Sequence, residues 1–435
     1  MRNAILSATF IGLAAGPIAG QSLYFPPIGP GAWDTLSPSD LGWCPDRIDS
    51  LIDFVGSRNT KAFLILKDGK IVIEHYYGTF TQDSLWYWAS AGKTLTAMLT
   101  GIAQEEGLLD IALPSSTYLG AGWTSCTPQQ EAQITVRDQL MMTSGLDDGV
   151  PDDNCTDPAC LQYLADAGTR WAYHNAPYTL LDDVIANAAG TTFSSYFNTR
   201  IRNRIGMDGF WFPGGSPYNN VYYSRARSMA RFGLLALNRG VWAADTVLHD
   251  TAYFNAMTTP SQTLNESYGY LWWLNGQPSY MLPGLQFVFP GPAMPDAPAD
   301  MICGLGKNDQ LLNVVPSRNM VVVRMGNDAY GSFSVATVLN NEIWQLIEQL
   351  PCATDVVGPG TTAGWELFPN PATDVVHLTL PPGRDRSVVE LLDALGRAVP
   401  VRWKGDGIDV AGLDRGLYTV VVQGGRSGMR RFLKE

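Results

Sequence analysis

Ser90 and Lys93 are the first residues in this sequence whose types and spacing could do chemistry. They stand three residues apart in the stretch WYWASAGKTLTAMLT, residues 86–100. Apolar residues at positions 95, 98, 99 and 102 predict a helix from Ser90, so the two side chains would lie one turn apart on the same side. A serine needs an adjacent base to become a nucleophile, and a lysine that burial makes neutral can be that base. The pair predicts acyl transfer through a serine.

The scarcity of lysine supports this interpretation. A Ser-x-x-Lys spacing arises by chance about once in a chain of this length, so the spacing alone is weak evidence. Of the 29 basic residues only seven are lysines, and between residues 94 and 403 there are fifteen arginines and one lysine, Lys307. Arginine does not give up its proton, whereas lysine can. Lys93 and Lys307 are therefore stronger candidates for the chemistry than ordinary surface lysines.

A tyrosine could complete the proton path, and Tyr-x-Asn occurs three times, beginning at Tyr173, Tyr196 and Tyr218. Tyr196 lies inside a helical pattern, where packing against neighbours is the simpler role. Tyr218 lies in a glycine-rich loop and stays open as an alternative. Tyr173 follows a turn and precedes a new helix, so it can point into a cleft between elements. We prefer Tyr173.

The elements that must position these residues form an α+β pattern. Residues 61–79 predict a hairpin around Asp68-Gly69, and residues 310–326 predict a second hairpin followed by a helix. Helical patterns between the hairpins cover residues 90–106, 136–142, 178–189, 193–205 and 225–238. Hairpins at both ends predict one antiparallel sheet flanked by helices, with an inserted helical region.

Composition shifts divide the chain. Residues 1–20 have the basic start, apolar core and small residues of a signal peptide. Residues 21–352 are long enough for the α+β domain, and residues 353–364 form a Gly- and Thr-rich linker. Residues 365–435 carry short alternating runs between turns, which predict a small β-sandwich. No later segment is typical of a transmembrane helix.

Charge and cysteine content narrow the class of protein. The net charge of -12 over 435 residues disfavours nucleic acid and anionic membranes as partners. Six cysteines fit an exported protein, and we expect Cys155 and Cys160, in the polar stretch PDDNCTDPAC, to form a disulfide. Their spacing is not that of a zinc site, and no histidine lies close by. We expect neither a metal nor another cofactor.

The order of the motifs resembles the serine β-lactamase and penicillin-binding superfamily. The stretches that carry the resemblance are SAGK at residues 90–93, ITVRDQLMMTSGL at 134–146, GTRWAYHNAPYTLL at 168–181 and GLGKNDQLLNVVPSRNMVVV at 304–323. The likeness is to the class C β-lactamase-related branch, which also contains D-aminopeptidases, carboxylesterases and nylon-oligomer hydrolases. The resemblance implies a serine hydrolase over about residues 40–350.

The resemblance also implies roles for single residues. Ser90 would form the acyl-enzyme, with Lys93 and Tyr173 as the proton-transfer pair. Asn175 would donate a hydrogen bond to the substrate. Lys307 would open the family's third motif on a strand that borders the site. The backbone N–H groups of Ser90 and Gln310 would stabilise the oxyanion.

One departure from the family pattern bears on the substrate. Asp309 stands where the third motif usually has glycine, which would place negative charge near an anionic β-lactam. We therefore expect a secreted serine hydrolase that cleaves an ester or an amide. The alternatives are a true β-lactamase, a D,D-peptidase or a D-aminopeptidase. A catalytically silent surface-binding protein of the same fold is a further alternative.

The C-terminal segment resembles a second family. PNP at residues 369–371, DALGR at 393–397, LDRGLY at 413–418 and a terminal basic run resemble the sorting domain of the type IX secretion system. That likeness implies export through the periplasm of a Gram-negative bacterium to the cell surface or the medium. The secretion machinery would then be a partner of residues 365–435.

Overall fold

The computed structural model describes residues 23–29, 31–213, 219–331, 336–352, 366–379, 389–393, 397–422 and 428–435. The chain divides into two units, one ending at Leu350 and the other beginning at Pro351. The predicted signal peptide, 1–20, and the predicted linker, 353–364, lie outside the described residues.

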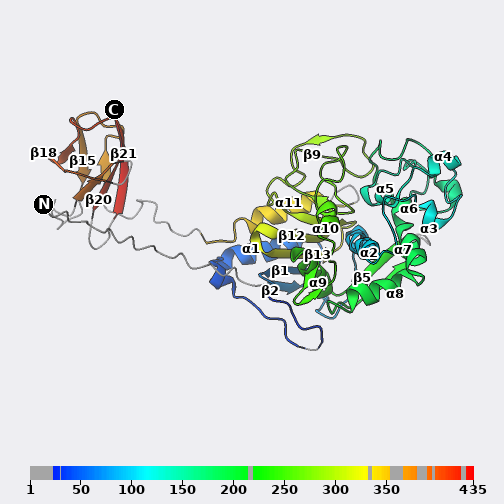
Figure 1. Ribbon diagram of the computed structural model, residues 1–435. Helices are drawn as coiled ribbons and strands as arrows, with labels where there is room; N and C mark the ends of the chain where they lie inside the picture. Colours follow the sequence, from blue (N-terminus) through cyan, green and yellow to red (C-terminus); the bar gives the residue numbers. More distant parts are fainter. Residues whose placement is uncertain are drawn as a thin grey trace, which may run out of the picture. The chain divides into compact units, whose positions relative to one another are not determined.

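A six-stranded antiparallel sheet runs through the described part of the first unit. Its order is β2 (Lys70–Tyr76), β1 (Thr60–Lys67), β13 (Met320–Gly326), β12 (Gln310–Val315), β11 (Ile302–Gly306) and β8 (Trp273–Leu274). Strands from both ends of the unit thus lie side by side (Figure 1). Asp68 and Gly69, with φ of 52° and 82°, form the tight β1–β2 turn. The predicted hairpins and single antiparallel sheet are confirmed.

Helices cover both faces of this sheet. On one face lies α9 (Ala226–Leu237), where a Cβ added at Gly233 would come within 2.5 Å of Val321 and 2.8 Å of Leu312. The next strand residue, Asn313, exchanges side-chain hydrogen bonds of 2.6 and 2.9 Å with Asn340 of α11 (Ala336–Ile347). Successive strand residues point to opposite faces, so α9 and α11 cover opposite sides. This explains why β12 and β13 are buried at every position.

Further helices pack against α11 and around the segment that contains Ser90. The helix α1 (Pro45–Ser57) contacts both α11 and β1 (Figure 1). The helical region includes α5 (Val136–Met141), α6 (Asn175–Thr179), α7 (Leu181–Ala189), α8 (Phe193–Phe197) and α10 (Thr251–Met257). Between this region and the sheet lies α2 (Lys93–Glu105), which contacts α7 and α10. The α-helix therefore begins at Lys93, after the 3₁₀ turn η2 (Ala89–Gly92) that holds Ser90.

The second unit is a strand-rich sandwich. Its described residues form two four-stranded sheets. One contains β14 (Glu366–Phe368), β15 (Val375–Thr379), β19 (Gly407–Asp409) and β18 (Trp403–Lys404); the other contains β17 (Ala398–Val399), β16 (Val389–Leu392), β20 (Gly416–Val422) and β21 (Gly428–Lys434). Val376 from the first sheet and Val420 and Phe432 from the second share one buried core. The predicted small β-sandwich is confirmed.

Candidate active site

Ser90 lies in a backbone turn that neighbouring strands hold in place. The N–H of Trp88 donates to the carbonyl of Tyr222 over 2.8 Å, and its indole N–H donates to Ser224 Oγ over 2.8 Å. Both partners belong to β5 (Asn220–Ser224). Ala89 has a φ of 48°, a left-handed conformation that costs a non-glycine residue about 1–3 kcal/mol. Such strain clusters at functional sites, and Ser90 follows it directly.

Two glycines let β11 approach this turn. A Cβ at Gly304 would lie 3.2 Å from the carbonyl oxygen of Ala91. A Cβ at Gly306 would lie 2.4 Å from the carbonyl oxygen of Trp88, closer than real Cβ atoms come to other atoms. The missing side chains therefore set the distance between β11 and the serine.

Lys93 is a buried amine beside Ser90. Its side chain is 3% exposed, and its Nζ lies 3.4 Å from Ser90 Oγ and 3.0 Å from Asn175 Oδ1. Burial lowers the pKa of Lys93 to about 7, although the nearby carboxylates of Asp153 and Asp182 act against this shift. About half of the amine is then neutral at pH 7. It can accept a proton from a hydroxyl 3.4 Å away.

Tyr173 completes a contact between three side chains. Its hydroxyl lies near that of Ser90, and its ring centre lies 5.3 Å from Lys93 Nζ. Burial raises the pKa of the Tyr173 hydroxyl well above its ordinary value, and the neighbouring Ser90 hydroxyl offsets only part of this shift. Tyr173 therefore stays an O–H group at neutral pH. Its ring stacks on Trp273, with centres 6.0 Å apart.

The two other Tyr-x-Asn sequences do not reach Ser90 in the described structure. The Tyr196 hydroxyl donates to Glu106 over 2.9 Å, and its ring is buried in α8. Tyr218 lies outside the described residues. Asn175, the last residue of Tyr173-His174-Asn175, is the first residue of α6. Because its Oδ1 accepts from Lys93, its Nδ2 is the group left to donate to a substrate.

Lys307 does not lie on a strand, contrary to the prediction. The strand β11 ends at Gly306, and residues 307–309 form the turn to β12. Asn308 and Asp309 in this turn have φ of 61° and 57°. Lys307 lines the cavity that contains Ser90, but it is exposed and pairs with no carboxylate among the described residues. The prediction came from the order of residues in the sequence, which does not show that the strand ends one residue before Lys307.

Gln310 is also misplaced in the prediction. In an antiparallel ladder the N–H and C=O groups of successive residues point to opposite sides. The carbonyl of Met301 accepts from Asn275 at the end of β8, so Cys303 and Leu305 face the β8 side and Gly306 faces Gln310. The backbone N–H of Gln310 is therefore directed into the ladder. Its side chain is buried and bonds the carbonyls of Lys307, Asn308 and Gly326.

Leu305, and not Gln310, has its backbone N–H at the free edge of β11. The β8–β11 pairing covers only Ile302 and Cys303, so the edge of β11 beyond Cys303 is unpaired. The N–H of Leu305 points from this free edge, and both Leu305 and Ser90 line the same cavity. Sequence reasoning missed Leu305 because a leucine in a buried strand gives no sign of which side its backbone faces.

Asp309 borders the cavity but its side chain is almost completely buried. It is 2% exposed, and its Oδ2 accepts a hydrogen bond of 3.0 Å from the N–H of Ala329. Burial raises the pKa of its carboxyl group above the ordinary value. The expectation that Asp309 replaces a strand glycine is therefore wrong, because the residue belongs to the turn after the strand.

The cavity around Ser90 measures about 760 Å³ and is acidic. Its wall includes Ser90, Tyr173, Asn175, Leu305 and Lys307, and also four carboxyl-bearing residues: Asp148, Asp153, Asp309 and Asp328. The Asp148 carboxylate pairs with Arg170 over 2.6 Å. In the described part of the chain, no group of His, Cys, Asp and Glu could hold a metal ion.

Residues that sequence reasoning missed surround Lys93 on its other side. The Tyr178 ring centre lies 3.8 Å from Lys93 Nζ. Asp182 stands one helical turn after Tyr178; its Oδ2 accepts from Asn220 over 2.8 Å, while its Oδ1 is buried without a partner in the described structure. Burial raises the pKa of Asp182 to about 7. The i, i+4 spacing of Tyr178 and Asp182 was the available signal.

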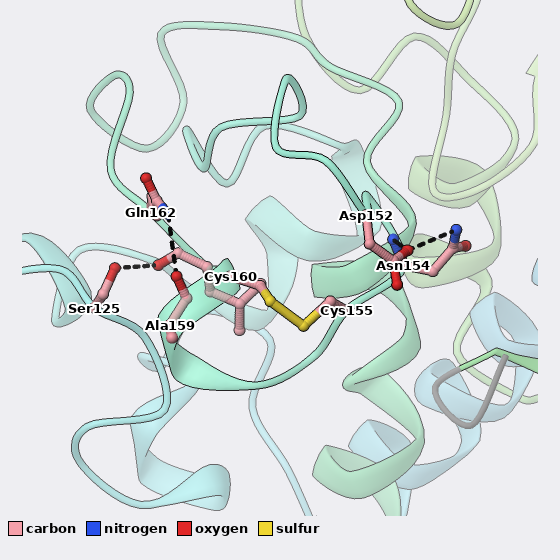
Figure 2. Close-up of a disulfide and its surroundings, with 8 residues drawn as sticks. Ser125, Asp152, Asn154, Cys155, Ala159, Cys160 and Gln162 are labelled. Atoms are coloured by element: carbon pink, nitrogen blue, oxygen red, sulfur yellow. Dashed lines mark hydrogen bonds between the residues drawn. A yellow bond between two sulfur atoms is a disulfide. The ribbon is translucent and has the colours of Figure 1, made fainter.

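A disulfide closes the loop beside the site (Figure 2). Cys155 and Cys160 are joined with an S–S distance of 2.06 Å, and Cys126 and Cys303 are free. Figure 2 shows the turn before the bond, where the N–H of Asn154 donates to Asp152 over 3.0 Å. The carbonyl of Asp153 accepts from the N–H of Ala176 in α6. The loop is thus tied to the helix that begins with Asn175.

Comparisons with known proteins match the two units to two families. Residues 51–342 match the family model described as Beta-lactamase, and residues 366–434 match that of the Secretion system C-terminal sorting domain. A search of curated proteins finds no match.

Solved structures share the fold of the first unit. One, assigned as a 6-aminohexanoate-dimer hydrolase from Bacillus anthracis, has a TM-score of 0.55 at 19% identity over 74% of this chain and 89% of its own. One assigned as a β-lactamase from Bacteroides dorei has a TM-score of 0.56 at 18% identity over 71% and 100%. A β-lactamase from Mycobacterium bovis has a TM-score of 0.51 at 18% identity over 69% and 99%.

Proposed function

The chain belongs to the β-lactamase family, and from this premise we propose that it is a serine hydrolase that cleaves an ester or an amide through an acyl-enzyme on Ser90. The observation that carries the proposal is the position of Lys93. Its Nζ lies 3.4 Å from Ser90 Oγ, and burial lowers its pKa to about 7. A base poised near the working pH is what activation of a serine requires.

The proposed reaction begins with neutral Lys93. Lys93 accepts the Ser90 proton while Oγ attacks the substrate carbonyl, and the oxyanion lies between the N–H groups of Ser90 and Leu305. The Tyr173 hydroxyl passes a proton to the leaving group and regains one from the Lys93 ammonium. A water molecule then attacks the acyl-enzyme by the reverse path, which releases the acid and restores Ser90.

The cavity wall favours a substrate without a carboxylate near the scissile bond. Four aspartates contribute to the wall; of these, Asp148 pairs with Arg170, and Asp309 is 2% exposed. The described wall has Lys307 as its exposed cation. An anionic β-lactam or a peptide with a free carboxylate would meet like charge there. This supports an ester or amide substrate over a β-lactam.

We also propose that the protein is secreted or displayed at the cell surface. The match of residues 366–434 to a sorting domain supports this destination. Export through the periplasm, with residues 1–20 as the signal peptide, is the route that we infer. Among the helices that the structure describes, none has the length and apolarity to cross a bilayer.

A fluorescent phosphonate tests the chemistry directly. The intact protein should be labelled at one serine, and Ser90→Ala should abolish the labelling because the attacking oxygen is gone. Ser84→Ala is the matched control, since Ser84 is partly exposed and lies outside the cavity. If the intact protein takes no label, it is a silent binding protein of the same fold and the proposal fails.

A small substrate panel separates the bond types. We expect turnover of p-nitrophenyl acetate and butyrate, and little turnover of nitrocefin because its carboxylate meets the acidic wall. A D-alanyl amide tests the amidase alternative. Rapid nitrocefin hydrolysis would identify a true β-lactamase and remove the electrostatic argument.

A further inference from the structure

An apolar loop borders the cavity that contains Ser90. It is the tip of the hairpin between β9 (Ser279–Tyr280) and β10 (Phe289–Pro290). Pro283 and Gly284 of this tip line the same cavity as Ser90. Directly after them, three large apolar side chains are exposed to solvent: Leu285 at 46%, Phe287 at 59% and Val288 at 51%.

The loop is held in this position by its own contacts. The side-chain N–H of Gln286 donates to the carbonyl of Trp171 over 2.9 Å, two residues before Tyr173. At the base of the hairpin, the Phe289 ring stacks on Tyr280 with centres 5.2 Å apart, and the Phe287 ring meets Phe289 edge-on at 4.7 Å. A fixed backbone therefore presents apolar groups to water. Contiguous exposed apolar surface of this kind marks a binding site.

We propose that Leu285, Phe287 and Val288 bind the hydrocarbon chain of the substrate, an inference that rests on the proposed hydrolysis at Ser90. The substrate is the expected ligand of these side chains because the loop tip is continuous with the reaction cavity, which Pro283 and Gly284 line. The cavity of about 760 Å³ is much larger than an acetyl group needs. A chain that leaves the carbonyl at Ser90 and extends past Pro283 and Gly284 reaches the segment that carries the three side chains. The substrate class is then an ester or amide of a medium-length aliphatic chain.

Chain length gives the expected effect. A methylene fully removed from water improves binding about fourfold, and a methylene covered on one side by the loop improves it about twofold. From acetate to octanoate we expect kcat/KM to rise about twofold per methylene until the chain passes the loop. The chain can belong to the acyl group or to the alcohol, so two substrate series are needed.

The experiment compares p-nitrophenyl esters from acetate to octanoate, kept below their aggregation concentration, with acetate esters of ethanol to octanol. The full-length protein is compared with a Leu285→Ser, Phe287→Ser, Val288→Thr variant. The matched control is Leu113→Ser, because Leu113 is 42% exposed and lies outside the cavity. In one of the two series, the ratio of kcat/KM for the eight-carbon chain to kcat/KM for the shortest ester should fall at least tenfold in the triple variant. Leu113→Ser should retain it.

The outcomes separate this inference from the function it rests on. If both series are flat in the intact protein while phosphonate labelling of Ser90 persists, the chain-binding role is wrong and the hydrolase remains. If the triple variant changes the oligomeric state in light scattering and leaves the chain-length preference intact, the loop is an interface between copies and the inference fails. If no ester is turned over and no serine is labelled, the proposed function itself fails.

Discussion

Arg324 and Lys93 are two buried cations that the protein treats in opposite ways. Arg324 is 0% exposed, and its guanidinium donates to the Thr60 hydroxyl and to the carbonyls of Arg58, Asn308, Asp309 and Asn327. Burial lowers its pKa to about 10, so it stays charged at neutral pH. Within the described residues, the hydrogen bonds of the Lys93 amine go to Asn175 and Ser90, and its pKa falls to about 7.

The difference lies in how completely each cation is solvated by the protein. Backbone carbonyls replace water around Arg324, so it can join the 307–309 turn, the end of β13 and the start of β1 while keeping its charge. The Lys93 amine has fewer acceptors than it would have in water, so its charged form is the less favoured one. A well-solvated buried cation supports structure, and a poorly solvated one is available as a base.

Lys93→Arg should give the largest effect. Arginine keeps the positive charge but cannot accept the Ser90 proton, so we expect kcat on p-nitrophenyl butyrate to fall about 10³-fold or more. Steady-state kinetics on the folded variant, checked by circular dichroism, measure this. Turnover like that of the parent protein would remove Lys93 from the mechanism.

Arg324→Met should be the most damaging change to stability. It leaves several buried carbonyls without a donor, and we expect the free energy of unfolding to fall by about 3–5 kcal/mol. Denaturation of the first unit in urea, followed by tryptophan fluorescence, measures it. Arg318→Met is the control, because Arg318 pairs with Glu348 on the surface, where such pairs contribute at most about 1 kcal/mol. Equal losses in both variants would contradict the comparison.

Lys93→Met should stabilise the protein. The folded pKa of about 7 lies below the ordinary lysine value, so at pH 7 folding removes about half of the proton that the unfolded chain binds. Replacing the amine by an apolar side chain removes this penalty, and we expect a gain of about 1–3 kcal/mol at pH 7. The gain should shrink as the pH rises from about 7 toward the unfolded lysine pKa near 10. A loss of stability would mean that Lys93 also has a structural role.

The pH dependence should be the mildest effect. Protonated Lys93 cannot act as a base, so kcat/KM should fall about tenfold per unit below a pKa of about 7 and level off above it. Ionisation of Tyr173 should not cause a second change in kcat/KM near neutral pH, because burial raises the pKa of its hydroxyl. Rates across pH 5–9 on an uncharged ester measure this. A profile that is flat down to pH 5 would exclude Lys93 as the base.

The fold could be predicted because its signals are local. Asp68-Gly69 marks the first turn, and the apolar spacing after Ser90 marks α2. The meeting of Ser90, Lys93, Tyr173 and Asn175 also followed from motif order, since each motif begins or precedes a helix. The exchange of Gln310 for Leu305 could not be predicted in this way. It depends on where the pairing between β8 and β11 ends, and neither strand's sequence alone shows that point.

Gly306 and the backbone turn at Trp88 should change together over evolutionary time. The Trp88 carbonyl oxygen occupies the space that a side chain at position 306 would need. A relative with a side chain at this position must carry a displaced nucleophile turn, and a relative with a different turn is released from the glycine. Two segments far apart in the chain are therefore expected to covary, and an alignment of relatives should show this.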